Sequence, residues 1–204
     1  MQANLELKLK KLRKNIRKLD SALVALSGGA DSSFLMRICR EELGNKSVAV
    51  TIVPSNYPSG DIIMAKRVAK ILGVKHVVHE MEETEEPPSS NICRGANMYS
   101  CLKSLAMNMK IKNVLDGSHA DDLKQGAVSF TAAKRAGFKS PLLESQLSKA
   151  EIRLLAKELG LPNWDKKPKT NKKQNTKSPS GKFKNTLKKS SKRKNSKKSN
   201  RKNR

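Results

Sequence analysis

The 204-residue sequence has few cysteines, few aromatic residues and no long apolar run. Its three cysteines, Cys39, Cys93 and Cys101, form no C-x-x-C pair, so the spacing supports neither a disulfide framework nor a metal cluster. An odd number of thiols is typical of reduced cysteines in the cytosol. No apolar run approaches the length of a membrane span, and the Lys-rich beginning lacks a signal-peptide pattern. The sequence therefore predicts a cytoplasmic protein with no membrane partner.

Acidic residues are absent from positions 166–204, which hold 18 of the 43 Lys and Arg residues. The remaining 25 basic residues face 18 acidic ones, so residues 1–165 carry a net charge of +7, against +25 for the whole chain. A segment dominated by Lys, Asn and Ser cannot bury a core. We predict one folded domain over 1–165, followed by a disordered low-complexity basic tail over 166–204.

The first 165 residues alternate between apolar runs and helical patterns. Leucines and isoleucines at spacings of three and four predict an amphipathic helix within 1–20. Strands are predicted at 22–26, 48–53, 75–79 and 112–116, and helices at about 32–43, 60–72 and 98–109. Ser148 and Glu151 form a capping box that predicts the start of a last helix. This alternation predicts an α/β fold, an open parallel sheet with helices on both faces.

Two adjacent glycines stand where the first strand ends: Ser27-Gly28-Gly29 follows the strand, and Asp31-Ser32-Ser33 opens the next helix. Glycines allow a tight turn and bring backbone N–H groups close to an anion, and the helix N-terminus adds donors and a partial positive charge. The serine hydroxyls can donate to phosphate oxygens. Asp31 would repel a bare phosphate, which indicates a divalent cation, Mg2+, between them. The alternative is an ordinary helix cap after a flexible turn.

The pattern S-G-G-x-D-S resembles the PP-loop of the N-type ATP pyrophosphatases, a superfamily that includes NAD, GMP and asparagine synthetases and tRNA-thiolating enzymes. The resemblance implies a Rossmann-like fold of the adenine nucleotide alpha-hydrolase type, with ATP and Mg2+ as cofactors. It also implies that a substrate oxygen attacks the α-phosphorus and that pyrophosphate leaves. By this analogy Ser27, Gly28, Gly29, Ser32 and Ser33 hold phosphates and Asp31 holds the metal. We also predict that Thr51, Ile52 and Val53, at the end of the second strand, border the adenine.

Two later stretches, VLDGSHADDL at 114–123 and SPLLESQLSKAEIRLLAKELGLPNWDK at 140–166, narrow the resemblance to the LarE-type sulfurtransferases of nickel-pincer cofactor maturation. By analogy Asp116, Gly117, Asp121 and Asp122 lie at the end of the fourth strand, where they hold metal or orient the substrate. The alternative is a solvated turn with an Asp cap. His119 stands where that family usually has Asn, and we expect it to be a structural residue. The expected acceptor is a small molecule, a carboxylate.

The match to the LarE type ends after Asp165 and Lys166. Members of that type continue with P-A-x-x-C-L, a cysteine that in some of them supplies the sulfur, and this chain does not. We therefore expect a truncated form that lacks the sulfur-donor cysteine. Three interpretations of 166–204 stay open: a tail that contacts nucleic acid non-specifically, a solvated extension without a partner, and translation in a shifted reading frame, which the position of the switch favours.

Two further functions remain as alternatives to the LarE-like enzyme. One is a PP-loop tRNA-modifying thiolase or amide-forming synthetase that grips RNA through its tail. The other is an inactive nucleotide-binding remnant whose basic tail binds nucleic acid. The sequence is also compatible with a homo-oligomer. It names neither the acceptor nor the nucleophile.

Overall fold

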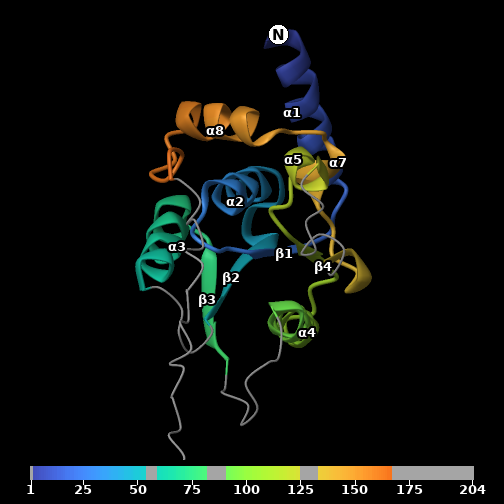
Figure 1. Ribbon diagram of the computed structural model, residues 1–204, viewed down its shortest axis with the longest axis vertical. Helices are drawn as coiled ribbons and strands as arrows, with labels where there is room; N and C mark the ends of the chain where they lie inside the picture. The colour runs from blue at the N-terminus through green and yellow to red at the C-terminus, as the bar shows by residue number, and fades with distance from the viewer. Residues whose placement is uncertain (1, 54–58, 82–90, 125–132, 167–204) are drawn as a thin grey trace, which may run out of the picture. The chain divides into compact units, whose positions relative to one another are not determined.

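The computed structural model of the protein describes residues 2–53, 59–81, 91–124 and 133–166, without the side chains of residues 59, 91–97 and 124. The elements occur in the order α1 (Gln2–Arg17), β1 (Ala22–Ala25), α2 (Ala30–Leu43), η1 (Gly44–Lys46), β2 (Ser47–Val53), α3 (Ser59–Leu72), β3 (Lys75–Glu80), α4 (Asn91–Asn108), β4 (Asn113–Leu115), α5 (Ala120–Lys124), α7 (Pro141–Glu144) and α8 (Lys149–Glu158). Figure 1 shows how these elements are arranged around the sheet.

The four strands form one parallel sheet in the order β3-β2-β1-β4. The strand register pairs Leu23 of β1 with Val48 of β2 on one side and with Val114 of β4 on the other. An isolated parallel bridge between Leu115 and Lys139 extends the sheet beyond β4. The predicted α/β fold, a parallel Rossmann-like sheet, is confirmed, and β1 lies at the point where the strand order changes direction.

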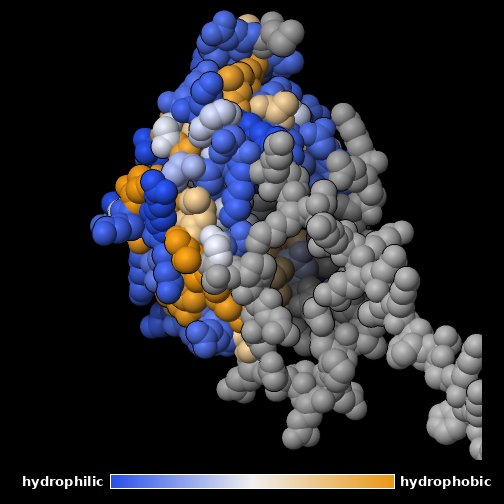
Figure 2. Space-filling model, turned by 60° about the vertical axis from the view of Figure 1, so that its left-hand side comes forward, coloured by the Kyte–Doolittle hydropathy of each residue, from blue (hydrophilic) through white to orange (hydrophobic). Residues whose placement is uncertain are grey.

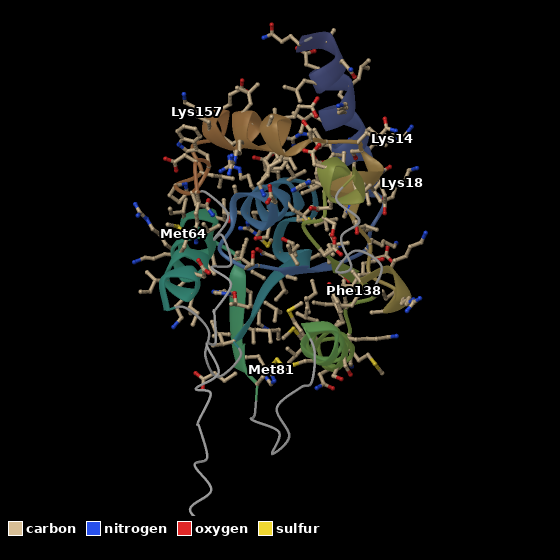
Figure 3. The ribbon with its side chains drawn as sticks, in the orientation of Figure 1. Lys14, Lys18, Met64, Met81, Phe138 and Lys157 are labelled. Atoms are coloured by element: carbon tan, nitrogen blue, oxygen red, sulfur yellow. The ribbon has the colours of Figure 1, made fainter. Side chains whose placement is uncertain are left out.

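Two apolar layers cover the two faces of the sheet, because alternate residues of each strand point to opposite sides. Val24 of β1 packs with α1, α2, α3 and α8, whereas Leu23 packs with α4 and the segment around Phe138. Figure 1 shows α4 on the face opposite α2 and α3. Met64 of α3 and Phe138 mark these two layers in Figure 3. Covered on both faces, the strands have the near-continuous apolar character seen in the sequence.

The N-terminal helix α1 packs against α2 through both apolar and charged contacts. Leu12 and Ile16 are fully buried in the first layer. Beside them, Arg13 and Arg17 each form an ion pair with Glu42 at 2.7 Å, and the Glu42 side chain is only 7% exposed. Burial by itself would raise the pKa of Glu42, but the hydrogen bonds from Arg13 and Arg17 lower it below its ordinary value.

This ion-pair cluster makes the stability of the fold depend on pH. The pKa of Glu42 is lowered in the folded state. Its contribution to the free energy of unfolding is therefore fully present above the unfolded pKa and is lost as the pH falls through the folded pKa. We expect Glu42→Gln to lower the free energy of unfolding by roughly 1 kcal/mol at neutral pH. The difference from wild type should close as the pH becomes acidic.

Urea unfolding across the acidic range measures this difference. Glu6→Gln, at an exposed position of α1, is the control and should leave stability unchanged at every pH. A loss in Glu42→Gln that did not vary with pH would contradict the assignment.

On the described surface, several large apolar side chains are exposed. Figure 2 brings the α3 side forward and shows apolar patches among hydrophilic ones. Ile63 and Ile71 of α3 are 65% and 54% exposed. The homo-oligomer stays a prediction.

None of the helices among the described residues is both long and apolar enough to span a bilayer.

The predicted boundary at residue 165 and the predicted disorder of the tail fall at or beyond the end of the described residues, so both stay predictions. The side chain of Cys93 also lies outside the description. Cys39 and Cys101 are free thiols. Cys39 is buried in the first layer, and burial raises the pKa of its thiol far above the ordinary value.

Candidate functional site

The β1–α2 loop lies at the carboxyl end of β1, the position at which open parallel sheets bind ligands. Four hydrogen bonds between its side chains and backbone shape it. Ser27 N–H donates to Ser32 Oγ at 3.2 Å, Ser32 Oγ donates to the Gly29 carbonyl at 3.3 Å, and Gly29 N–H donates to Ser27 Oγ at 3.4 Å. The hydroxyls of Ser27 and Ser32 also bond to each other at 3.1 Å. Gly29 is the N-cap of α2, and no side chain caps the helix. The first-turn N–H groups of α2 are therefore available to an anion.

Gly28 adopts a conformation that other residues rarely adopt, with φ of +75°. A Cβ at this position would overlap the backbone carbonyl oxygen of Asp61 and lie 3.2 Å from the backbone nitrogen of Ala65. The loop thus sits directly on the first turns of α3. The glycine is required both by its backbone angle and by this close approach.

The loop that follows β4 packs against the start of α2. A Cβ on Gly117 would lie 3.1 Å from the backbone nitrogen of Ser32, so this position too leaves little room for a side chain. Asp116 lies beneath it, 8% exposed, and accepts a hydrogen bond from Ser118 N–H at 3.0 Å. The second half of the loop is fixed by Asp122, which accepts the backbone N–H of His119 at 2.8 Å. The loop after β4 therefore lies beside the start of α2, and the assignment of its aspartates to metal or substrate stays a prediction.

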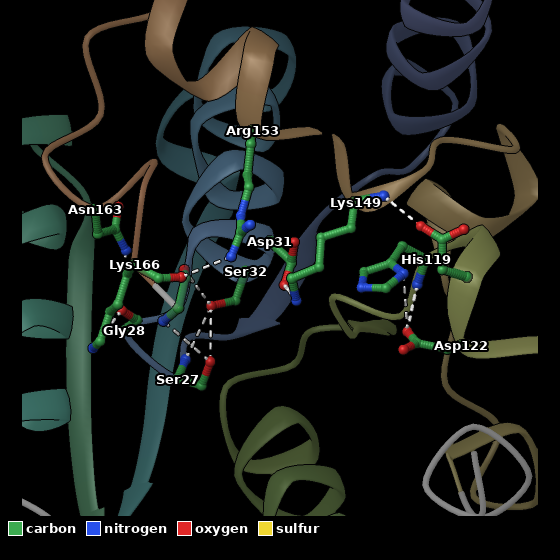
Figure 4. A network of polar contacts seen from close by, with 12 residues as sticks. Ser27, Gly28, Asp31, Ser32, His119, Asp122, Lys149, Arg153, Asn163 and Lys166 are labelled. Carbon is green, nitrogen blue, oxygen red and sulfur yellow. Dashed lines mark hydrogen bonds and ion pairs between the residues drawn. The ribbon is translucent and has the colours of Figure 1, made fainter. Parts of the chain in front are cut away.

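Helix α8 brings a lysine to the same place. Ser148 and Glu151 form the predicted capping box, and Asp121 accepts the backbone N–H of Lys149 at 2.8 Å. The Lys149 ammonium then donates to Asp31 Oδ2 at 3.1 Å. Figure 4 shows this lysine reaching across to Asp31, with His119 beside it. The α8 N-terminus is therefore tied to both the β4 loop and the start of α2.

These elements line a cavity of about 290 Å³ that is open to solvent. It is lined by Ala25, Ser27, Asp31, Ser32, Gly117, Ser118, His119, Asp122 and Lys149. The Oδ1 atom of Asp31 is buried and has no hydrogen-bond partner among the described residues. The cavity therefore offers serine hydroxyls, a helix N-terminus and an ammonium group, together with a carboxylate that is only half satisfied.

His119 is buried in the wall of this cavity, with 5% exposure. Its Nδ1 lies 3.5 Å from Asp122 Oδ2, beyond ordinary hydrogen-bond length, and has no hydrogen-bond partner among the described residues. We expected a structural residue here. The structure adds that this imidazole borders the site.

Asp116 and Tyr99 are both buried, and both have pKa values above their ordinary range. Burial raises the pKa of Asp116, although hydrogen bonds from Ser118 and Ser140 oppose the rise. Burial also raises the pKa of Tyr99, and the charge of Asp116 raises it further. The Tyr99 ring packs edge-on against Phe138, with centroids 5.1 Å apart. This carboxyl belongs to the packing under the β4 loop and does not line the cavity.

The structure gathers some of the predicted site residues and separates others. Ser27, Asp31, Ser32, Gly117 and Asp122 line the cavity. The predicted site residues that are not among its lining residues are Gly28, Gly29, Ser33, Asp116, Asp121 and the segment 51–53.

The residues outside the cavity wall have other contacts. The hydroxyl of Ser33 is buried and accepts from Asn163, and the Asp121 carboxylate caps α8. The Thr51 hydroxyl donates to the Leu26 carbonyl at 2.7 Å. Ile52 packs in the second apolar layer. The assignments of all these residues to phosphate, metal and adenine stay predictions.

Sequence reasoning missed Lys149, Asn163 and Lys166. All three lie in the quoted stretch 140–166, where the capping box predicts a helix but says nothing about which side chains reach the loop after β1. Lys149 and Asp31 are 118 positions apart. Only their presence in a stretch shared with the LarE type could have pointed to them.

A parallel sheet with S-G-G-x-D-S at its switch point defines the class of PP-loop ATP pyrophosphatases, which use ATP. The chain belongs to the NAD synthase family, whose model matches residues 4–123. Its likeness to the NMN synthetase of Francisella tularensis shows the same fold: the TM-score is 0.67 at 17% identity, over 80% of this chain and 75% of that one.

Two curated relatives cover most of the chain. An uncharacterized protein of Synechocystis, slr1717, is 35% identical over 79% of this chain and 63% of its own length. The pyridinium-3,5-bisthiocarboxylic acid mononucleotide synthase of Lactiplantibacillus plantarum is 29% identical over 74% of this chain and 57% of its own length. The chain thus spans about three fifths of these relatives.

Proposed function

We propose that this protein is an adenylating enzyme that cleaves ATP to AMP and pyrophosphate. The observation that supports it most directly is the cavity at the carboxyl ends of β1 and β4, which is lined by Ser27 of the β1–α2 loop, by the uncapped start of α2 and by Lys149. A triphosphate needs N–H donors and positive charge, and these three features supply both. Ser27, Gly28, Gly29 and Ser32 would hold the outer phosphates.

In the proposed reaction an oxygen of the acceptor attacks the α-phosphorus. The bond from that phosphorus to the bridging oxygen breaks, and pyrophosphate leaves with the electron pair. The chain contributes positioning and charge neutralisation rather than covalent chemistry. Ser33 is left out of the phosphate set because its hydroxyl bonds to Asn163 at 2.9 Å.

Asp31 is the residue that would hold Mg2+. Its buried, unpartnered Oδ1 fits a hard cation, which prefers carboxylate oxygens. In the part of the chain that the structure describes, no three His, Cys, Asp or Glu side chains gather into a metal site. The other ligands would then be phosphate oxygens and water, as is usual for this ion. When bound, Mg2+ neutralises charge on the phosphates.

The acceptor we propose is a carboxylate on a pyridine mononucleotide, with LarE-like sulfur transfer as the overall reaction. The name of the Lactiplantibacillus relative supports this choice, because a thiocarboxylic acid forms when sulfur replaces an oxygen of a carboxyl group. Adenylation makes that oxygen a leaving group. Neither Cys39 nor Cys101 lines the cavity, so the sulfur would come from outside the described residues.

The test incubates the full chain with Mg2+, ATP and a pyridine carboxylate mononucleotide, with and without added sulfide. The expected products are AMP and pyrophosphate, with a thiocarboxylate only when sulfide is present. Release of ADP and phosphate would contradict the proposal. Turnover only with tRNA would favour the thiolase, and absence of nucleotide binding would favour the inactive remnant.

Lys149 offers a first mutational check. We expect Lys149→Met to raise the KM for ATP about tenfold or more, because the cavity loses its one ammonium group among the described lining residues. Steady-state release of pyrophosphate measures it. Lys112→Met, at a lysine that is 80% exposed and outside the cavity, should leave KM unchanged. Equal KM values for the two variants would show that Lys149 does not bind the phosphates of ATP.

A further inference from the structure

We propose that Asn163 and Lys166 are positioning residues that hold the Gly28–Gly29 peptide in its phosphate-binding orientation. Both follow α8 in the sequence, and Asn163 is 135 positions from Gly28. The inference deepens the proposed function and rests on it, since it concerns the same loop. It assigns a role to the segment 161–166, which contacts this loop through Asn163 and Lys166.

Two side chains bind one backbone carbonyl. Asn163 Nδ2 donates to the Gly28 carbonyl oxygen at 3.0 Å and to Ser33 Oγ at 2.9 Å. Lys166 Nζ donates to the same carbonyl at 3.1 Å and to Asp61 Oδ1 at 2.6 Å. Asn163 is 1% exposed, so this is an internal contact rather than a surface one. Figure 4 shows both side chains on the side of the loop away from Lys149 and His119.

The orientation of this peptide decides whether the loop attracts or repels an anion. In a trans peptide the carbonyl and the N–H point in opposite directions. Holding the Gly28 carbonyl toward Asn163 therefore directs the Gly29 N–H toward Ser27 Oγ, on the cavity side. Reversal of the peptide would remove this donor and turn a carbonyl oxygen toward the phosphate. Glycines on both sides of the peptide make such a reversal cheap unless something opposes it.

Lys166 also joins three segments that are distant in the sequence. Its ammonium links the β1–α2 loop, the first turn of α3 through Asp61, and the segment after α8. Arg153 of α8 donates to the Lys166 carbonyl at 3.1 Å, which holds the backbone of this residue in place. The loop is thus held from outside the cavity by groups that need not touch the nucleotide.

Loss of these contacts should weaken binding more than catalysis. If only a fraction of molecules has the competent peptide orientation, the apparent dissociation constant rises by the inverse of that fraction, while bound molecules react normally. We expect Lys166→Met to raise the Kd for Mg2+-pyrophosphate about fivefold, with kcat at saturating ATP within about twofold of wild type. Lys166→Arg should recover most of the affinity.

Asn163→Asp is the sharper variant, because it keeps the shape of the side chain and places a carboxylate oxygen against the Gly28 carbonyl. We expect at least a tenfold rise in the Kd for Mg2+-pyrophosphate, because two close oxygens with no proton between them repel each other. If Asn163→Asp does not fold, the Lys166 variants still test the proposal, because the Lys166 side chain is 27% exposed. Lys157→Met is the control, because Lys157 lies 4.9 Å over the Trp164 ring of the same segment without touching the loop.

The experiment combines calorimetric titration with inorganic pyrophosphate and Mg2+, steady-state kinetics, and hydrogen exchange of the Gly29 amide. Faster exchange of that amide in Lys166→Met, together with the rise in the Kd for Mg2+-pyrophosphate, is the expected result. Unchanged affinity and exchange in both variants, or a fall in kcat with KM unchanged, would overturn the proposal. If wild type bound no pyrophosphate, the proposed function would fail, whereas the exchange measurement would still decide the role of Lys166.

Discussion

Replacing Gly28 by alanine is expected to lower the free energy of unfolding by about 2–4 kcal/mol. Two effects add. The backbone angle of +75° is unfavourable for a residue with a Cβ, and the new methyl group would overlap the Asp61 carbonyl. Because that carbonyl belongs to the first turn of α3, relief of the overlap must move the loop or the helix. Urea or thermal unfolding measures the loss.

A matched glycine separates the two effects. Gly73 also has a positive φ, +59°, but a Cβ there would meet nothing within 4 Å. Gly73→Ala should therefore cost only the backbone strain, about 1 kcal/mol. The difference between the two variants isolates the close approach of the loop to α3. Equal losses would show that the contact with Asp61 does not restrict the loop.

Replacing Asp31 by alanine is expected to abolish ATP–pyrophosphate exchange, with a fall of at least about 100-fold, while the fold stays intact. The carboxylate has one oxygen paired with Lys149 and one buried oxygen without a hydrogen-bond partner among the described residues. Its removal takes away the proposed Mg2+ ligand. It does not leave a charge trapped, because the Lys149 side chain is 32% exposed and can be solvated.

Two further variants sharpen this prediction. Asp31→Asn keeps the shape of the side chain but not its charge, and should raise the Mg2+ concentration needed for half-maximal exchange. Asp20→Ala removes a carboxylate that is 81% exposed and distant from the cavity, and should leave exchange unchanged. Exchange at the wild-type rate in Asp31→Ala, with Tm preserved, would refute the assignment of this residue.

The sheet could be predicted from the sequence because its signals are local. Short apolar runs that alternate with helical patterns along the chain indicate the buried strands of a parallel sheet. The capping box of Ser148 and Glu151 marked the start of α8 in the same way, since both of its hydrogen bonds join residues three apart. The loop after β1 was placed by the order of its neighbours, a strand before it and a helix after it.

The site was only partly predictable because its assembly depends on contacts between distant segments. Asp121 and Asp122 are adjacent and look equivalent in the sequence, yet one caps α8 and the other lines the cavity. Ser32 and Ser33 separate likewise, because successive side chains on a helix point about 100° apart. Ser32 faces the cavity and Ser33 faces Asn163.

The amino-acid sequence by itself determined the parallel α/β architecture and the position of the glycine loop, because both depend on residues that are neighbours in the chain. The tertiary structure decided which side chains from the segment after Gly137 reach that loop. Lys149 meets Asp31, and Asn163 and Lys166 meet Gly28, across more than 100 positions. Such pairings depend on how α8 packs against α2, and no local periodicity encodes that packing.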